Sequence, residues 1–134
     1  MEEKSISLRL SELEHTYMAK TSNGELMVGE QGFRPMELLL AALAGCSGVD
    51  ISQILKKKRQ EVRDIQIDVK GTRRDEYPRV YEKISLRYRV YGKNVKEKAV
   101  EEAIRLSVEK YCSVYAMLSK ACHIEVSFEV VNEA

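Results

Sequence analysis

A long apolar segment near the N-terminal third of the chain constrains its fold most. A helix is predicted to begin at Pro35, where the missing backbone donor costs nothing in the first turn, and to run to Lys58 or Arg59. From Met36 to Cys46 it is apolar nearly all round, which is typical of a helix buried on every side. One sheet covers only one face of a helix. Packing two such helices together in an intertwined dimer would bury the rest.

The remaining elements follow from hydrophobic periodicity. Alternating apolar residues predict strands, and Asn23-Gly24 predicts a hairpin because both positions tolerate a positive φ. Strands cluster instead of alternating strictly with helices, which favours an α+β fold with an antiparallel sheet in one domain, residues 1–134. The expected elements are strands over 6–10, 15–21 and 25–28, the helix from 35, strands over 65–69 and 80–90, helices over 95–108 and 114–118, and a strand over 124–130.

Composition narrows the classes of partner. The net charge of +1 gives no bulk electrostatic argument for binding nucleic acid or an anionic membrane. Residues 1–6 lack the pattern of a secretory signal, and the strongly apolar run at 38–44 is too short to span a bilayer as a helix. We therefore expect a cytoplasmic protein. The basic run at 56–59 complements the negative end of the helix dipole, with an interaction module as the alternative reading.

The three cysteines are the candidates for chemistry. Stable disulfides are uncommon in the cytoplasm, so Cys46, Cys112 and Cys122 are core residues, metal ligands or reactive thiols. Two histidines and three scattered cysteines do not favour a metal site. Cys122 reads as a core residue and His15 as a surface residue. No glycine-rich phosphate loop, CxxC, HExxH or GxSxG motif occurs.

Cys46 and Cys112 differ in their surroundings. Cys46 lies in the apolar helix between Gly45 and Ser47-Gly48, and the glycines lower helix propensity in a way that suits a close approach by backbone or ligand. Cys112 precedes a short helix whose free backbone donors would stabilise a thiolate. Each cysteine on its own is equally consistent with a small buried hydrophobic residue.

Two motifs carry a family resemblance. The segment 34–46, Arg-Pro-Met-Glu-Leu-Leu-Leu-Ala-Ala-Leu-Ala-Gly-Cys, resembles the cysteine helix of the OsmC/Ohr family of osmotically induced and organic hydroperoxide resistance proteins. The segment 109–114, Glu-Lys-Tyr-Cys-Ser-Val, is similar to its second cysteine motif. The predicted order of strands and helices also suits the family, and both motifs look closest to its general OsmC-like branch.

The resemblance implies a fold and an activity. The fold is an intertwined α+β homodimer, with antiparallel sheets around two central cysteine-bearing helices. The activity is thiol-dependent reduction of organic hydroperoxides, and more weakly of hydrogen peroxide, in oxidative stress defence. Cys46 would be the peroxidatic cysteine and Cys112 the resolving one. An external dithiol, such as a lipoyl protein, would reduce the disulfide, and no bound cofactor, metal, membrane or nucleic acid is implied.

The resemblance also implies a cation that activates the buried Cys46 thiol, because burial raises a thiol pKa. The family supplies an arginine balanced by a glutamate. Arg34 is the replacement candidate here, followed by Arg9, and Glu37 is the candidate carboxylate. In the peroxidase branch the glutamate directly follows the proline, where this chain has Met36. That departure favours the alternative, a small-molecule-binding or redox-sensing protein without efficient peroxidase turnover.

Overall fold

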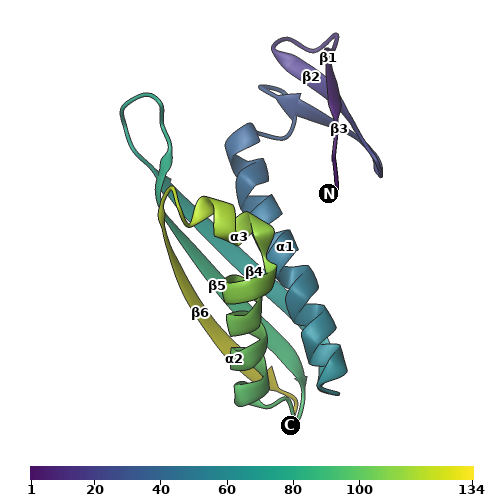
Figure 1. Ribbon diagram of the computed structural model, residues 1–134, viewed down its shortest axis with the longest axis vertical. Coiled ribbons are helices and arrows are strands. Elements are labelled where there is room, and N and C mark those ends of the chain that lie inside the picture. The colour runs from purple at the N-terminus through teal and green to yellow at the C-terminus, as the bar shows by residue number, and fades with distance from the viewer. The chain divides into compact units, whose positions relative to one another are not determined.

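The computed structural model describes residues 1–134 and divides them into two compact units, Met1–Leu39 and Leu40–Ala134. Figure 1 labels the elements of both. The first unit holds a three-stranded antiparallel sheet of β1 (Ser7–Leu10), β2 (Thr16–Thr21) and β3 (Gly24–Gly29), in that order. The predicted hairpin is confirmed, but its turn lies one residue earlier than Asn23-Gly24, because Thr21 pairs with Gly24 across Ser22-Asn23. Of the predicted pair only Gly24 has a positive φ, +145°, which is open to glycine but strained for other residues.

Helix α1 (Pro35–Lys57) begins where the proline predicts and ends before Arg59, which has a φ of +58°. Within the chain only one stripe of this helix is buried, so the prediction of burial on every side is not met by a single copy. The physical reason is that one sheet covers one face, while residues such as Ala41, Ala42 and Gly45 stay exposed. The buried stripe consists of Leu43, Ser47, Ile51 and Leu55.

The second unit contains a sheet in the order β4-β5-β6, formed by β4 (Glu61–Arg73), β5 (Tyr81–Lys93) and β6 (His123–Asn132). β4 and β5 are antiparallel, but β5 and β6 are parallel, so the expectation of an antiparallel sheet is wrong for this pair. The chain between them is long enough for a crossover, which a parallel pair requires. It contains α2 (Glu97–Leu106), the π-helix η1 (Ser107–Tyr111) and α3 (Ser113–Leu118).

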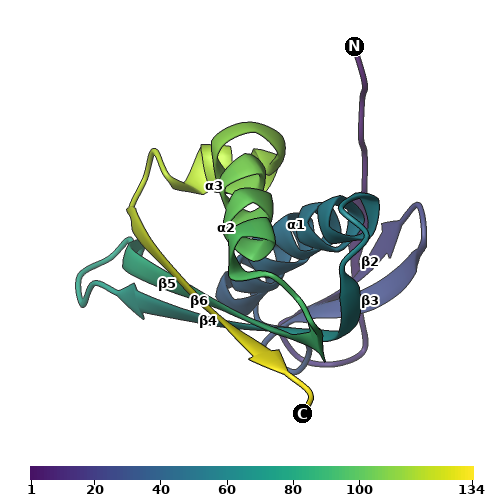
Figure 2. The ribbon, with the colours of Figure 1, turned by 90° about the horizontal axis from the view of Figure 1, so that it is seen from below.

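The core of this unit lies between the sheet and its helices. Figure 2 shows α2 and the C-terminal part of α1 on the same face of the sheet. Gly48 allows α1 to approach β4, because a Cβ at that position would lie only 3.0 Å from Cδ1 of Ile67. The fully buried residues of β5 that face these helices are Ile84, Leu86, Tyr88 and Val90. The buried residues of α2 and of the segment just before it are Val95, Ala99, Val100, Ala103 and Ile104.

The predicted bounds of β4 and β5 need correction. β4 extends to Arg73, beyond the predicted end at Val69, and β5 begins at Tyr81 with Tyr81 buried and Glu82 exposed. A register shift between Thr72 and Arg73 accounts for the change of face, because an irregularity in pairing interrupts strict alternation.

Helix α1 is also long and apolar enough to cross a membrane by length and composition, with a mean hydropathy of 1.7 over an 18-residue window. The prediction that this region is too short to span a bilayer is therefore wrong in length, because the helix extends well beyond residues 38–44. Core helices of soluble proteins pass the same test, and the buried stripe of α1 packs against its own sheet.

Candidate functional site

Helix α1 places Cys46 on a half-buried strip beside its buried stripe. Asp50 lies one turn further along, on the same side of the helix, because residues four apart are neighbours on a helix surface. Ser47, the residue after Cys46, belongs to the buried stripe and points into the core. The turn that carries the thiol therefore presents a sulfur, a hydroxyl and a carboxylate toward the rest of the second unit.

Cys112 lies between η1 and α3 in an extended conformation, with φ −78° and ψ 100°. The residue is only 3% exposed. Its backbone N–H donates to the Ser107 carbonyl at 2.7 Å, closing the π-helical turn. Its sulfur accepts the backbone N–H of Tyr115 at 3.4 Å and so caps α3. The predicted break in helical pattern around Cys112 is thus confirmed.

The structure brings the two cysteine side chains together. Cys46 and Cys112 are both free cysteines, and Cys46 lies near enough to Cys112 to contribute to the pKa of its thiol. Burial is the main cause that raises the pKa of Cys112 to about 11; the Tyr115 N–H opposes it, whereas Cys46 and the negative charge of Asp50 add to it. The sequence predicts that backbone donors at the start of the short helix stabilise a Cys112 thiolate. The Tyr115 N–H does so, but the net effect of the surroundings is to raise the pKa, so the prediction is wrong in its net direction. Cys112 is a neutral thiol at pH 7.

A buried cluster of hydroxyl groups adjoins the thiols. Ser47 Oγ lies 2.6 Å from the Tyr88 hydroxyl and 2.9 Å from Ser107 Oγ, and Ser107 Oγ donates to Asp50 Oδ2 at 2.9 Å. Ser47, Tyr88 and Ser107 are completely buried. Burial is the leading cause that raises the pKa of Tyr88 to about 12, so its hydroxyl keeps its proton. The cluster joins α1, β5 and η1 around the two cysteines.

A cavity of about 410 Å³ opens beside this cluster. It follows the half-buried strip of α1 away from Cys46, from Asp50 toward the basic end of the helix. Lys58 forms an ion pair with Glu102 of α2 at 2.6 Å, which supports the structural reading of the basic run. The lining residues are Asp50, Gln53, Ile54, Lys57, Lys58, Leu106 and Tyr111.

The predicted supporting residues lie in the N-terminal unit. Arg34 is exposed and donates to the backbone carbonyl of Glu30 at 3.3 Å. Glu37 is exposed in the first turn of α1, where a carboxylate favours the helix dipole. Arg9 is exposed on β1. Within the second unit, the charge that acts on Cys112 is the anionic Asp50.

His15 and Cys122, the other residues singled out from the sequence, are not part of the cysteine site. His15 is exposed next to Glu14, as predicted for a surface residue. Cys122 is half-buried, its thiol donates to the Leu118 carbonyl at 3.6 Å, and burial raises its pKa. No group of three or more His, Cys, Asp or Glu side chains gathers as a metal-binding cluster anywhere in residues 1–134.

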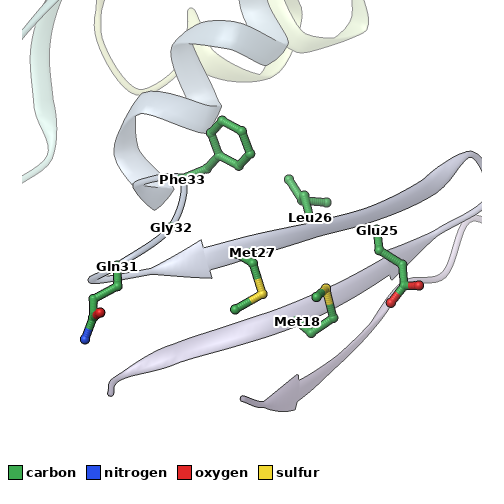
Figure 3. Close-up of a pocket in the computed structure, with 7 residues that line it drawn as sticks. All are labelled: Met18, Glu25, Leu26, Met27, Gln31, Gly32 and Phe33. Carbon is green, nitrogen blue, oxygen red and sulfur yellow. The ribbon is translucent and has the colours of Figure 1, made fainter. Parts of the chain in front are cut away.

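The N-terminal unit has an open cavity of its own, of about 400 Å³, on the β2–β3 hairpin (Figure 3). Its lining is mostly apolar and contains no nucleophile. Phe33 and Leu26 lie on one side of it, and Met18 and Met27 extend along the strands. The polar members are Glu25 and Gln31.

Sequence reasoning missed Ser47, Asp50, Tyr88 and Ser107 as a group. One signal was available: Ser47 is the polar member of an otherwise apolar stripe at four-residue spacing with Leu43 and Ile51. A buried serine must find a hydrogen-bond partner, which points to polar groups on the facing elements.

Fold and site together define an α+β protein with two neighbouring free thiols at the junction of a long helix and a π-helical segment. The OsmC-like protein family model matches residues 28–127, which is most of the chain. This chain therefore belongs to the OsmC-like family. Protein YhfA of Escherichia coli K12 is 43% identical over 121 residues, covering 87% of this chain and 90% of its own.

Solved structures agree. A hypothetical protein from Aquifex aeolicus matches with a TM-score of 0.96 and 51% identity, covering 100% of both chains. An organic hydroperoxide resistance protein OsmC from Legionella pneumophila matches with a TM-score of 0.68 and 11% identity, covering 96% of this chain and 98% of its own. At that identity the second match shows the fold alone.

Proposed function

We propose that this protein is a thiol-dependent peroxidase that reduces organic hydroperoxides, and hydrogen peroxide more weakly. The observation that carries the proposal is the proximity of Cys46 and Cys112, two free thiols on different elements that Ser107 links through its side chain and its backbone carbonyl. Membership of the OsmC-like family supports the substrate class, together with the resemblance of both cysteine motifs to the OsmC/Ohr family. The cytoplasmic location and a role in oxidative stress defence are part of the same proposal.

In the first step the Cys46 thiolate attacks the peroxide oxygen distal to the organic group. The O–O bond breaks, the alcohol leaves after taking up one proton, and Cys46 becomes a sulfenic acid. Cys46 is half-buried and Cys112 is 3% exposed, so Cys46 is the better placed of the two to meet a peroxide. Cys112, with a pKa raised to about 11, is a neutral thiol at pH 7 and so adds no negative charge beside Cys46.

In the second step the Cys112 sulfur attacks the Cys46 sulfenic sulfur. Cys112 loses its proton, the S–OH bond breaks, and water leaves as the disulfide forms. An external dithiol then reduces this disulfide by exchange and is itself oxidised. A lipoyl protein is our proposed donor, and the protein needs no bound cofactor or metal for these steps.

We propose a homodimer in which two copies of α1 pack together. The support is the exposed small and apolar surface of this helix, with Val49 56% exposed in one chain. Arg34, followed by Arg9, is our candidate for the cation that activates Cys46, with Glu37 as its carboxylate partner. Neither membrane nor nucleic acid takes part in the proposal.

The test is peroxide consumption at pH 7 with dihydrolipoamide or dithiothreitol as reductant. Cys46→Ser is expected to abolish turnover because it removes the attacking sulfur. Cys112→Ser is expected to leave a single sulfenic acid on Cys46 and to slow turnover. Cys122→Ser, a matched cysteine substitution away from the pair, is expected to behave as wild type. Equal turnover by wild type and Cys46→Ser would refute the assignment.

The anionic surroundings of the thiols favour a second candidate, a redox-sensing or small-molecule-binding protein without efficient turnover. Asp50 raises the pKa of Cys112, whereas an efficient thiol peroxidase requires a nearby cation. Mass spectrometry after treatment with one equivalent of cumene hydroperoxide separates the two. A Cys46–Cys112 disulfide with rapid turnover supports the peroxidase; a slowly formed disulfide supports a sensor, and untouched thiols support a binding protein.

A further inference from the structure

The hydroxyl cluster beside the thiols has a defined direction. Each hydroxyl carries one hydrogen, and an ionised carboxylate only accepts, so Ser107 gives its hydrogen to Asp50. Ser107 must then accept from Ser47, and Ser47 must accept from Tyr88. The hydrogen-bond chain therefore runs from Tyr88 through Ser47 and Ser107 and ends at Asp50. The carboxylate sets the orientation of every member.

This hydrogen-bond chain joins the two cysteine-bearing segments. Ser47 and Asp50 belong to the turn of α1 that begins at Cys46. The side chain of Ser107 bonds to both of them, while its backbone carbonyl accepts the N–H of Cys112 at 2.7 Å. One residue thus contacts the Cys46 turn through its side chain and Cys112 through its main chain.

Whether the two sulfurs can bond depends on how the segments that carry them are held relative to each other. A disulfide forms only when the Cα atoms lie within roughly 7 Å and the Cβ vectors point toward each other. Ser47 and Ser107 are 0% exposed, so water does not replace a lost partner in the chain. Asp50 itself is half-buried and lines the 410 Å³ cavity.

We propose that Asp50 is a positioning residue that, through Ser107, holds Cys112 within disulfide-forming reach of Cys46. The inference rests on the dithiol–disulfide cycle proposed above. It adds a residue that touches neither the peroxide nor the reacting sulfurs and acts through its hydrogen bond to Ser107. Tyr88, at the far end of the chain, orients Ser47 but does not itself join α1 to η1.

The test measures how readily the two thiols close to a disulfide, in a Cys122→Ser background that leaves only Cys46 and Cys112. Oxidised glutathione is the oxidant. One thiolate attacks a glutathione sulfur and releases one glutathione; the other then attacks the mixed disulfide, releases the second glutathione and closes the protein disulfide. Quenching and mass spectrometry across glutathione ratios at pH 7 give the effective concentration of the pair.

Four substitutions separate positioning from general destabilisation. Asp50→Asn keeps an oxygen that accepts from Ser107, so the effective concentration is expected within about twofold of the parent. Asp50→Leu and Ser107→Ala remove the connection, and a fall of about tenfold or more is expected. Gln53→Leu changes the lining of the same cavity, but Gln53 is not part of the hydrogen-bond chain, so the effective concentration is expected to stay unchanged.

Circular dichroism first checks that each variant is folded at the temperature of the assay. If Ser107→Ala does not fold, Asp50→Leu alone tests whether the link to Ser107 positions Cys112. An unchanged effective concentration in Asp50→Leu would overturn the proposal, as would an equal fall in Asp50→Asn. No peroxide enters the measurement. A protein without peroxidase turnover would still give the expected order of variants, so failure of the proposed function is distinguishable from failure of this inference.

Discussion

At the scale of single residues, Cys112 combines burial with a defined set of partners. The residue is 3% exposed, and its sulfur accepts one backbone N–H while its thiol adjoins Cys46. A neutral thiol in this place has two uses in the proposed cycle. It adds no charge beside Cys46 before oxidation, and it supplies the sulfur that resolves the sulfenic acid afterwards.

The raised pKa of Cys112 predicts a loss of stability at alkaline pH. The folded protein holds the thiol proton up to about pH 11, whereas the unfolded chain releases it near pH 9. The folded state therefore binds more protons between these values, and the free energy of unfolding falls as pH rises through them. The contribution is at most about 3 kcal/mol. Urea unfolding under reducing conditions at pH 8, 9, 10 and 11 measures it.

Cys112→Ser is the variant that isolates this contribution, because serine does not titrate in the window. Its unfolding free energy is expected to fall less steeply between pH 9 and 11 than that of wild type. Tyr88, with a pKa of about 12, adds a similar loss at higher pH, so Tyr88→Phe serves as a second comparison. Parallel curves for wild type and Cys112→Ser would contradict the prediction.

The sequence predicts some of the site residues well and others not at all. Cys46 and Cys112 stand out because the motifs around each are specific. Asp50, Ser107 and Tyr88 do not, because hydrogen bonds between residues 41 to 60 positions apart leave no periodic trace in the sequence. Tyr88 has the pattern of an ordinary inward-facing strand residue, and only the structure shows where its hydroxyl points.

At the scale of elements, the main departure from expectation is the parallel pairing of β5 with β6. The period of apolar residues identifies which face of a strand is buried, and Ile124 and Phe128 are indeed on the same face as Ile84 and Tyr88. Periodicity carries no information on strand direction. The length of the α2–η1–α3 connection was the only available signal, since parallel neighbours need a crossover of a dozen residues or more.

Gly92 marks the place where β5 approaches the start of β4 most closely. A Cβ there would collide with the carbonyl oxygen of Glu61 and with Cγ2 of Val95. We expect Gly92→Ala to lower the free energy of unfolding by about 1–3 kcal/mol, measured by urea unfolding at pH 7. Gly45→Ala is the matched control, because nothing in the same chain lies within 4 Å of a Cβ at that position. Both variants are compared in a Val49→Lys background, in which we expect no second copy of α1 to cover Gly45.

Gly45→Ala is expected to raise stability by as much as about 1 kcal/mol, because alanine favours a helix interior over glycine. The two alanine variants should therefore differ in sign. If Gly92→Ala were no less stable than Gly45→Ala, the close approach between β4 and β5 would not limit the size of residue 92.

At the scale of the whole molecule, the exposed side of α1 carries the prediction of a dimer. Val49 is 56% exposed on a helix whose opposite side is fully buried. Val49→Lys places a charge on this side and is expected to shift the protein from twice the 15.4 kDa mass of one chain to a single chain. Sedimentation equilibrium over a range of protein concentrations measures the shift.

Val131→Lys is the control for that experiment, since Val131 is a similarly exposed valine, 41% accessible, on β6. It is expected to leave the molecular mass unchanged. A wild-type protein that sediments as one chain at all concentrations would contradict the dimer, and equal effects of both lysine variants would place the contact elsewhere.

In the π-helical turn from Ser107 to Tyr111, the number of residues matters to the site as well as their type. Its carbonyl-to-amide bond spans five residues, from Ser107 to Cys112, where an α-helix would span four. Deleting one residue from this turn would allow α2 to continue as an α-helix and would rotate the following residue by about 100°. The distance in sequence between Ser107 and Cys112 is therefore expected to tolerate changes of residue type far better than changes of length.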